Sequence, residues 1–310
     1  MQVTDAILVI GAGGFIGQHL VRALAQRGNP IIAADRCAMD FRLANVQTHI
    51  GELREPEDFL PLIARSRTVV YLASTSTPAS SIGEPIAEFV RNLYPMRALL
   101  QVLPSRPEID LIHLSSGGSL YAVAENESAG EDGKVAPRSY HGAGKVATEH
   151  FVSAWCAQYS SAATIVRPSN IYGPGQHERK NFAIVPTAFG KILNSETLTV
   201  RGDGSAIRDY LYIDDFVTLL IDILAAPVQA GVHIINASTG VGTSLDQLFG
   251  AMETVTGRRL LRKYNSVNVV DAERTVLNSS LAKQRYGWSS TTCLQDGLRR
   301  TWDWLTTTPR

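Results

Sequence analysis

Three glycines near the N-terminus have the spacing of a phosphate-binding turn. Gly11, Gly14 and Gly17 follow the apolar run 7–10, which is typical of a buried parallel strand. The first glycine permits a tight turn, the second lets the backbone approach a pyrophosphate, and the third lets the following helix pack closely on the strand. Because a helix N-terminus also offers free N–H groups and a positive dipole end, the turn predicts diphosphate binding.

An acidic residue, Asp35, ends the next expected strand, at residues 30–35. A carboxylate about 20 residues beyond the glycine turn accepts hydrogen bonds from ribose hydroxyls and repels a 2′-phosphate, which favours NAD over NADP. Arg36 keeps NADP open, since a guanidinium beside the ribose could pair with a phosphate. Strand, turn, helix, strand and acid in this order predict a dinucleotide cofactor, with NAD preferred.

Hydroxyl and ionisable residues occupy two further stretches. Ser116 and Ser119 follow an expected strand at 110–114, and the carboxyl end of such a strand lies beside a bound nicotinamide. His141 and Lys145 are four residues apart in an expected helix, so they share one face. Tyr140 diverges from Lys145 by about 140° around that helix and faces elsewhere.

Strands and helices alternate through the first half of the chain, which predicts an α/β fold with a doubly wound parallel sheet of the Rossmann type. We expect this domain to cover residues 1–170, with a return segment near 210–238, and a smaller mixed domain to cover 171–310. The expected strands are 7–10, 30–35, 68–73, 110–114 and 232–236, with a short strand and turn at 48–53. The expected helices include 56–65, 86–103, 185–193 and 294–305.

Composition excludes several classes of function. Lysine plus arginine and aspartate plus glutamate are 29 each, so the net charge is zero and neither a nucleic-acid nor a membrane-surface partner is expected. No apolar run reaches the roughly 20 residues that cross a bilayer, and we expect a cytoplasmic protein. The three cysteines and seven histidines lack metal-ligand spacing, so we expect neither a disulfide framework nor a metal.

Together these motifs resemble the extended short-chain dehydrogenase/reductase superfamily, in particular its NAD-dependent nucleotide-sugar epimerases and dehydratases such as UDP-hexose 4-epimerases. The resemblance covers essentially the whole chain. Besides the glycine turn, it rests on Gly51-Glu-Leu53, Leu72-Ala-Ser74, Asn92, the segment Arg167-Pro-Ser-Asn-Ile-Tyr-Gly-Pro-Gly175, Gly202-Asp-Gly204, and Arg208-Asp-Tyr-Leu-Tyr-Ile-Asp-Asp215.

The resemblance implies a set of cofactor and substrate contacts. For NAD these are Gly11, Gly14, Phe15, Ile16, Gly17, Asp35, Arg36, Glu52, Leu53, Leu72, Ala73, Ser74, Asn92, Lys145 and Pro168. For the nucleotide sugar they are Asn170, Arg208 on the diphosphate and, as a weaker candidate, Arg274. The alternatives are an ion pair of Arg208 with Asp203 or Asp209, and a turn role for Asn170. Residues 176–182 are expected to shape the sugar pocket.

Two positions depart from the family pattern. His141 stands where the family has its catalytic tyrosine, with Tyr140 one place earlier, and Gly117 stands where the family has a serine or threonine. A histidine can exchange protons near neutrality, and Lys145 would keep it uncharged and able to act as a base. On this hypothesis His141 is the acid/base, Ser116 or Ser119 assists, and Lys145 holds the nicotinamide ribose.

The resemblance therefore predicts an NAD-dependent nucleotide-sugar epimerase, acting at C4 of a UDP-hexose or UDP-N-acetylhexosamine through a 4-keto intermediate, in a polysaccharide or glycoconjugate pathway. Two alternatives remain open. One is an NAD(P)-dependent sugar-nucleotide reductase or dehydratase, although the Gly117-Gly-Ser119 stretch supplies no acid for dehydration. The other is a catalytically impaired binding member. Family members usually dimerise through two helices, here 86–103 and the one containing Lys145, so we expect a homodimer.

Overall fold

The computed structural model describes residues 5–122, 127–178, 183–265 and 273–307, and the chain forms two compact units. The first comprises Met1–Ser116, Ser139–Arg167 and Leu219–Ile235, and the second comprises Gly117–Arg138, Pro168–Thr218 and Asn236–Arg310. Residues 117–138, expected within the first domain, thus cluster with the second unit.

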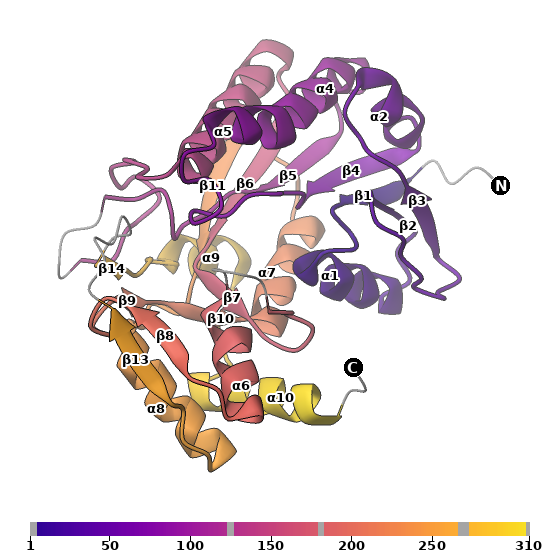
Figure 1. Cartoon of the computed structure of the whole chain (residues 1–310). Coiled ribbons are helices and arrows are strands. Elements are labelled where there is room, and N and C mark those ends of the chain that lie inside the picture. The colour runs from indigo at the N-terminus through magenta and orange to yellow at the C-terminus, as the bar shows by residue number, and fades with distance from the viewer. Residues whose placement is uncertain (1–4, 123–126, 179–182, 266–272, 308–310) are drawn as a thin grey trace. The chain divides into compact units, whose positions relative to one another are not determined.

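A seven-stranded sheet forms the centre of the first unit (Figure 1), in the order β11-β6-β5-β4-β1-β2-β3. Its strands are β1 (Ala6–Ile10), β2 (Ile31–Asp35), β3 (Val46–Ile50), β4 (Ser66–Tyr71), β5 (Asp110–Leu114), β6 (Ala162–Pro168) and β11 (Gly231–Ala237). Every pairing from β3 across to β6 is parallel. Because the order reverses at β1, this is a doubly wound Rossmann sheet, which confirms the expected fold class.

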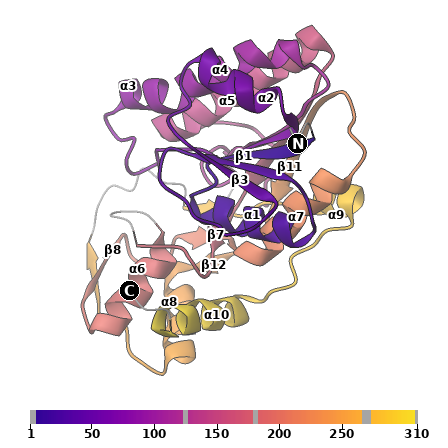
Figure 2. The ribbon, with the colours of Figure 1, turned by 90° about the vertical axis from the view of Figure 1, so that its right-hand side faces the viewer.

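Helices cover the sheet on both faces. Helix α1 (Phe15–Gln26) lies on one face, and α2 (Pro56–Ile63), α4 (Tyr94–Val102) and α5 (Tyr140–Tyr159) lie on the other, as Figures 1 and 2 both show. Strands β1 and β5 are buried at every residue, as expected of apolar strands covered on both sides.

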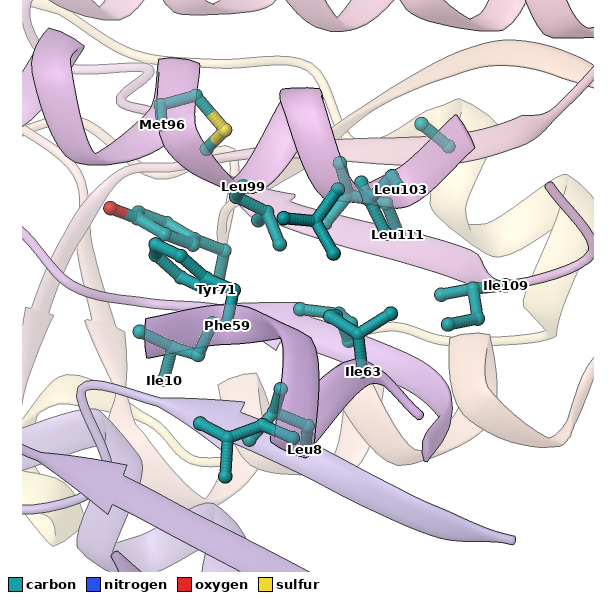
Figure 3. Close-up of a cluster of buried hydrophobic side chains, with 14 of the residues drawn as sticks. Leu8, Ile10, Phe59, Ile63, Tyr71, Met96, Leu99, Leu103, Ile109 and Leu111 are labelled. Carbon is teal, nitrogen blue, oxygen red and sulfur yellow. The ribbon is translucent and has the colours of Figure 1, made fainter. Parts of the chain in front are cut away.

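An apolar core fills the space between the sheet and the three helices α2, α4 and α5. Figure 3 shows Leu8 and Leu111 of the sheet facing Phe59 and Ile63 of α2 and Leu99 of α4. All five side chains are at most 1% exposed. Burying side chains of this size contributes roughly 1.5–3 kcal/mol each, so this core is a large part of what holds the strand ends in place.

The helix expected at 86–103 is interrupted. It consists of α3 (Pro85–Glu88), a π-helical turn η1 (Phe89–Leu93), α4, and a 3-10 turn η2 (Leu103–Ser105). Pro95 has no N–H to donate to the carbonyl of Arg91, so the regular ladder fails there. The N–H of Tyr94 instead bonds the carbonyl of Phe89, five residues back.

In its described residues, the second unit is built from short strands and four complete helices. The strands are β7 (Asn170–Tyr172), β8 (Leu198–Arg201), β9 (Ile207–Arg208), β10 (Tyr210–Tyr212), β12 (Thr243–Ser244), β13 (Arg262–Asn265) and β14 (Arg274–Thr275). The helices are α6 (Ile184–Asn194), α8 (Leu245–Thr256), α9 (Ser280–Tyr286) and α10 (Leu294–Thr307), while α7 (Ile213–Ala225) is divided between the units. In the described part of the chain, no helix is long and apolar enough to cross a membrane.

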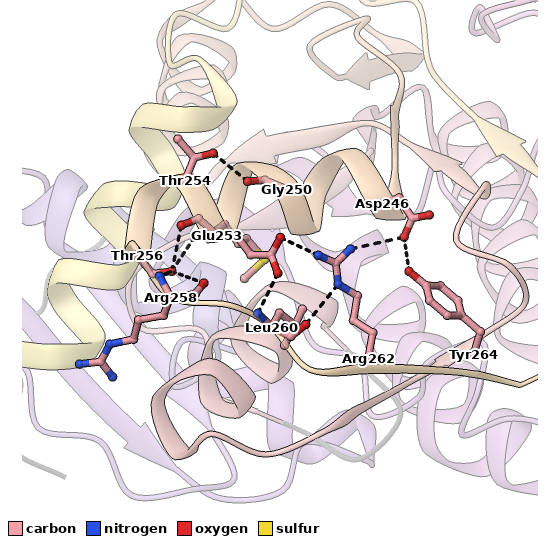
Figure 4. Close-up of polar contacts among 10 residues, drawn as sticks. Asp246, Gly250, Glu253, Thr254, Thr256, Arg258, Leu260, Arg262 and Tyr264 are labelled. Carbon is pink, nitrogen blue, oxygen red and sulfur yellow. Dashed lines mark hydrogen bonds and ion pairs between the residues drawn. The ribbon is translucent and has the colours of Figure 1, made fainter.

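One charged side chain attaches β13 to α8 in this unit. Figure 4 shows the guanidinium of Arg262 between two acids of α8, with Nη2 2.6 Å from Glu253 and Nη1 3.7 Å from Asp246. The hydroxyl of Tyr264 donates to the same Asp246 oxygen over 2.6 Å. Ion pairs and a hydrogen bond thus join the short strand to the acids of α8.

Candidate functional site

The glycine turn between β1 and α1 has the geometry that phosphate binding needs. Gly11 has φ +87°, and a Cβ there would lie 2.8 Å from the backbone nitrogen of Ala73. A Cβ on Gly17 would clash with the carbonyl oxygen of Gly11, so only glycine lets α1 start this close to the strand. Helix α1 begins after Gly14 without a side-chain cap, which leaves its first N–H groups available to an anion.

Asp35 is held against this turn at the end of β2. Its Oδ2 accepts from the N–H of Gly13 and its Oδ1 from the N–H of Cys37, both over 3.0 Å. A carboxylate has about four acceptor positions, so two remain for the hydroxyls of a ribose. Arg36 is exposed and, among the described residues, has no hydrogen bond or ion pair. The turn and the acid therefore fit a dinucleotide, and no steric feature of the turn argues against one.

The other expected cofactor contacts in the first unit follow strand ends. Leu72 and Ala73 come directly after β4, and the N–H of Leu72 bonds the carbonyl of Ile10 at the end of β1. Leu53 packs against the core, while Glu52 is exposed and pairs with Arg54 over 3.4 Å. These segments lie at the carboxyl edge of the sheet, where ligands bind in doubly wound folds.

Asn92, in the π-helical turn η1, is the centre of a polar network beside this edge. Its Oδ1 accepts from the backbone N–H of Thr75 over 2.9 Å. Its Nδ2 donates to the carboxylate of Glu88 and to the hydroxyl of Ser76, each over 2.9 Å. Because a backbone N–H can only donate and a carboxylate accepts, these contacts fix the orientation of the amide.

His141 joins the same network from the start of α5. Its Nδ1 lies 2.8 Å from the hydroxyl of Ser76, and its backbone N–H donates to the hydroxyl of Ser81 over 3.2 Å. The cap residue Ser139 accepts from the N–H of Gly142, which starts the helix so that His141 is buried and Tyr140 is 46% exposed. The histidine, not the neighbouring tyrosine, therefore faces the interior.

Lys145 lies one helical turn further along α5 and is also buried, with Nζ donating to the carbonyl of Leu114 over 2.8 Å. Burial lowers the pKa of Lys145 to about 8, against the opposing effect of the carboxylates of Glu88 and Glu149. Burial and the nearby charge of Lys145 lower the pKa of His141 to about 3. The imidazole is therefore neutral at pH 7, and so weak a base binds a proton only at strongly acidic pH.

The serines expected to assist are separated by the division into units. Ser116 is half-buried just beyond β5 in the first unit, whereas Gly117 and Ser119 belong to the second. Gly117 is buried, and its N–H donates to the carbonyl of Pro168 over 2.8 Å. A possible role of either serine in catalysis stays a prediction.

In the second unit, the expected substrate contacts lie on short strands. Asn170 begins β7, with Oδ1 placed 3.3 Å from where a Cβ of Gly118 would be, and its N–H donates to the carbonyl of Asp209. Arg208 lies on β9 next to β14, which carries Arg274. The register pairs Arg274 with Ile207, so in regular strands the two arginines point to opposite faces, and a second diphosphate contact from Arg274 stays a prediction.

The two acids weighed as partners of Arg208 have other contacts. The carboxylate of Asp209 accepts from Ser169, Thr239 and Gly240, and that of Asp203 accepts from Ser205. Within the described ranges Arg208 has no ion pair, and its Nη1 donates to the carbonyl of Ile207. This leaves a half-buried cation suited to a phosphate group.

Sequence reasoning missed two residues that contact the expected site, Ser76 and Glu88. For Ser76 the signal is the polar loop of small residues at 74–81, because such a loop after a strand lies where a doubly wound sheet meets its ligand. For Glu88 the structure shows that a Cβ on Gly144 would clash with its carboxylate. Residues 179–182 of the expected sugar-pocket loop lie outside the described residues. Among the residues described, no three or more acids, histidines and cysteines lie close enough to hold a metal ion, and the three cysteines are free thiols.

Comparison with known proteins agrees with this arrangement. The model of the NAD dependent epimerase/dehydratase family matches residues 7–238. A UDP-glucose 4-epimerase of Mycolicibacterium smegmatis is 28% identical over 306 residues, covering 95% of this chain and 96% of the relative.

Two solved structures are similar over almost their whole length. The UDP-glucose 4-epimerase of Thermotoga maritima, solved with UDP-glucose, has a TM-score of 0.90 and 26% identity over 97% of this chain and 98% of its own. The UDP-glucose 4-epimerase of Thermus thermophilus, in complex with NAD, has a TM-score of 0.90 and 26% identity over 98% of this chain and 100% of its own. The expectation of NAD as cofactor is thus confirmed, and the chain belongs to the NAD-dependent epimerase/dehydratase family.

Proposed function

We propose that this protein is an NAD-dependent nucleotide-sugar epimerase that acts at C4 of a UDP-hexose or UDP-N-acetylhexosamine. The observation that carries the proposal is that one unit contains both the cofactor site and the catalytic candidates. The glycine turn and Asp35 form the first, and the buried side chains of His141 and Lys145 on α5 form the second. The similarity to UDP-glucose 4-epimerases over nearly the whole chain supports the same activity.

The first unit offers a contact for each polar part of the cofactor. The N–H groups after Gly14 suit the pyrophosphate, Asp35 suits the adenosine ribose, and the ammonium of Lys145 suits the nicotinamide ribose. When bound, NAD supplies the acceptor and donor of hydride. The chain supplies the groups that orient the sugar and control its proton.

Proton control falls to the buried face of α5. Burial, aided by the nearby positive charge of Lys145, lowers the pKa of His141 to about 3 and so holds its imidazole neutral, while the pKa of Lys145 itself is lowered to about 8. Ser116, close to the carboxyl end of β5, is the candidate hydroxyl for the sugar oxygen. In the second unit, Arg208 and Asn170 are proposed to hold the diphosphate and the sugar of the substrate.

The burial of His141 favours a second candidate, an NAD(P)-dependent reductase of a keto-sugar nucleotide. With its pKa near 3, neutral His141 is a poor base for a sugar hydroxyl but can still donate a hydrogen bond to a carbonyl oxygen. Net consumption of reduced cofactor separates this candidate from an epimerase, which regenerates its own.

The deciding experiment is proton NMR of the purified protein with NAD and a panel of UDP-hexoses and UDP-N-acetylhexosamines, beside His141→Tyr. Interconversion of C4 epimers by the unmodified protein supports the proposal. Turnover by His141→Tyr alone would mean that the scaffold binds the sugar but the natural chain does not epimerise it. If neither protein interconverts C4 epimers, and the unmodified protein oxidises NADH or NADPH stoichiometrically with a keto-sugar nucleotide, the epimerase proposal is wrong and the reductase is supported.

We also propose that the protein is a homodimer, associating through the helices of the first unit. Helix α5 packs against α3 and η1, and three large apolar side chains there are exposed: Ile86 by 76%, Phe89 by 60% and Phe151 by 60%. Large apolar side chains exposed on helices that pack together are typical of interaction surfaces.

A further inference from the structure

The direction of each hydrogen bond around Asn92 can be assigned from the chemistry of its partners. The backbone N–H of Thr75 requires the oxygen of the amide, and the carboxylate of Glu88 requires its nitrogen. The bond between Asn92 Nδ2 and Ser76 Oγ therefore runs from nitrogen to oxygen, and the serine is the acceptor.

This assignment uses one lone pair of the serine oxygen and leaves its proton free to be donated. Having accepted from Asn92, Ser76 still has one proton to donate, and the only other hydrogen-bond partner of its side chain among the described residues is His141 Nδ1, 2.8 Å away. A hydroxyl that donates to Nδ1 requires an unprotonated Nδ1. In a neutral imidazole the proton must then be on Nε2.

We propose that His141 carries its proton on Nε2 and presents it as a hydrogen-bond donor to an oxygen of the substrate, and that Ser76, oriented by Asn92 and Glu88, is the positioning residue that sets this tautomer. Nε2 has no partner of its own within the described ranges, so its N–H is available to a ligand. This inference rests on the proposed function for the identity of the ligand, but not for the tautomer.

The tautomer specifies the chemistry that the site favours. An Nε2–H group stabilises a lone-pair acceptor, such as the carbonyl oxygen of the 4-keto intermediate of the proposed epimerase. The proton of the sugar hydroxyl is then accepted by a group other than His141. Buried Glu88 is important to this arrangement, because its carboxylate accepts from Asn92 and so prevents the amide from flipping. Gly144 makes room for that carboxylate beside α5.

The test is long-range 1H–15N correlation spectroscopy of protein labelled with 15N-histidine, recorded without sugar. The chain has seven histidines, so the signals of His141 are assigned by their loss in His141→Gln. We expect a protonated Nε2 and an unprotonated, hydrogen-bonded Nδ1. A protonated Nδ1 would overturn the proposal.

Exchanging the acid and the amide between positions 88 and 92 should reverse the direction of the hydrogen bonds that lead to His141, with little change in side-chain size. In the double variant Glu88→Gln with Asn92→Asp, the new carboxylate can only accept, so Ser76 must donate to it and accept from His141. We expect the proton to move to Nδ1. A folded double variant that retains the Nε2–H form would refute the positioning role.

Two serine variants keep the test decisive if that double variant does not fold. Ser76→Ala removes the donor, so the Nδ1 resonance should shift, whereas Ser80→Ala, an exposed serine of the same loop, should leave it unchanged. Unchanged Nδ1 in Ser76→Ala would exclude the serine as the positioning residue. If turnover of a sugar nucleotide is found, the reversed variant should lower kcat by about 10²–10³-fold, as loss of one oriented donor does. If no turnover is found, the proposed function fails while the spectra still decide the tautomer.

Discussion

Glu149 and Arg167 form a doubly hydrogen-bonded ion pair in the interior of the first unit. Nε of the arginine lies 2.9 Å from Oε1 of the glutamate and Nη2 lies 2.5 Å from Oε2. The side chains are 7% and 4% exposed, and the hydroxyl of Ser115 donates to the same carboxylate over 2.5 Å. Because Glu149 belongs to α5 and Arg167 to β6, the pair fixes the helix that holds His141 and Lys145 to the sheet.

Breaking this pair should destabilise the fold strongly. Arg167→Met leaves a buried carboxylate without its counter-charge, for which we expect a loss of about 3–5 kcal/mol in the free energy of unfolding. The double variant Glu149→Leu with Arg167→Met should recover most of this loss, because no isolated charge then remains. Urea denaturation gives the free energy of unfolding of the unmodified protein, the single variant and the double variant. The exposed pair Lys191–Glu196 is the matched control, and Glu196→Gln should leave the transition unchanged. Equal effects at the two pairs would contradict this account.

Gly17→Ala should impair both folding and cofactor binding. The added methyl would clash with the carbonyl oxygen of Gly11 and lie 2.7 Å from Cα of Ala12, so α1 must move away from the turn. Overpacking of this kind costs roughly 1–3 kcal/mol. We expect a correspondingly lower melting temperature and weaker binding of NAD in calorimetry.

The control for that substitution is Gly250→Ala in α8, where a Cβ would meet nothing within 4 Å. Alanine is the better helix former by about 1 kcal/mol, so this variant should be slightly more stable and bind NAD normally. Normal NAD affinity in a folded Gly17→Ala protein would show that close approach at the turn is not required.

How far the sequence predicts this structure depends on the range of the contacts. The strands β1 and β5 were located from their apolar runs, because a buried parallel strand is recognisable within five residues. The four-residue spacing of His141 and Lys145 predicts that they share one face of the helix, and in the structure both are buried. Only the family resemblance indicated that this face belongs to the site. The interruption at Pro95 was missed, although a proline lacking a donor inside a helical pattern was visible.

The polar network cannot be predicted from the sequence, because Ser76 and His141 are 65 residues apart. The third member, Asn92, lies in the irregular turn η1, which no local pattern indicates. The second unit was difficult for a related reason. Strands such as β9 and β14 have two residues each and exist only through pairing with distant segments, which leaves no local periodicity to detect.

Asp110 should make the stability of the protein depend on pH. Its side chain is 9% exposed at the start of β5 and, among the described residues, has no hydrogen-bond partner. Burial raises the pKa of this carboxyl from 3.8 to about 6. A raised carboxyl pKa means that the folded state holds the proton more tightly, so stability is lost as the pH rises from about 4 through 6.

Asp110→Asn removes this effect. Two pKa units correspond to about 3 kcal/mol, so the asparagine variant should gain up to that amount relative to the unmodified protein between pH 4 and pH 7. Urea denaturation at several pH values measures the difference. A difference in stability that does not vary with pH would show that the carboxyl is not perturbed in the fold.

The exposed apolar surface of the first unit should be needed for dimer formation. Replacing both Phe89 and Phe151 by glutamate places four like charges across a two-fold interface, since each site occurs twice. We expect sedimentation velocity to show a monomer that retains NAD binding, because neither side chain is part of the glycine turn or of the network around Asn92. Val241→Glu, 62% exposed in the second unit, is the control and should sediment as the unmodified protein does. A double variant that still sediments as a dimer would place the interface elsewhere, whereas a monomeric unmodified protein would exclude the dimer itself.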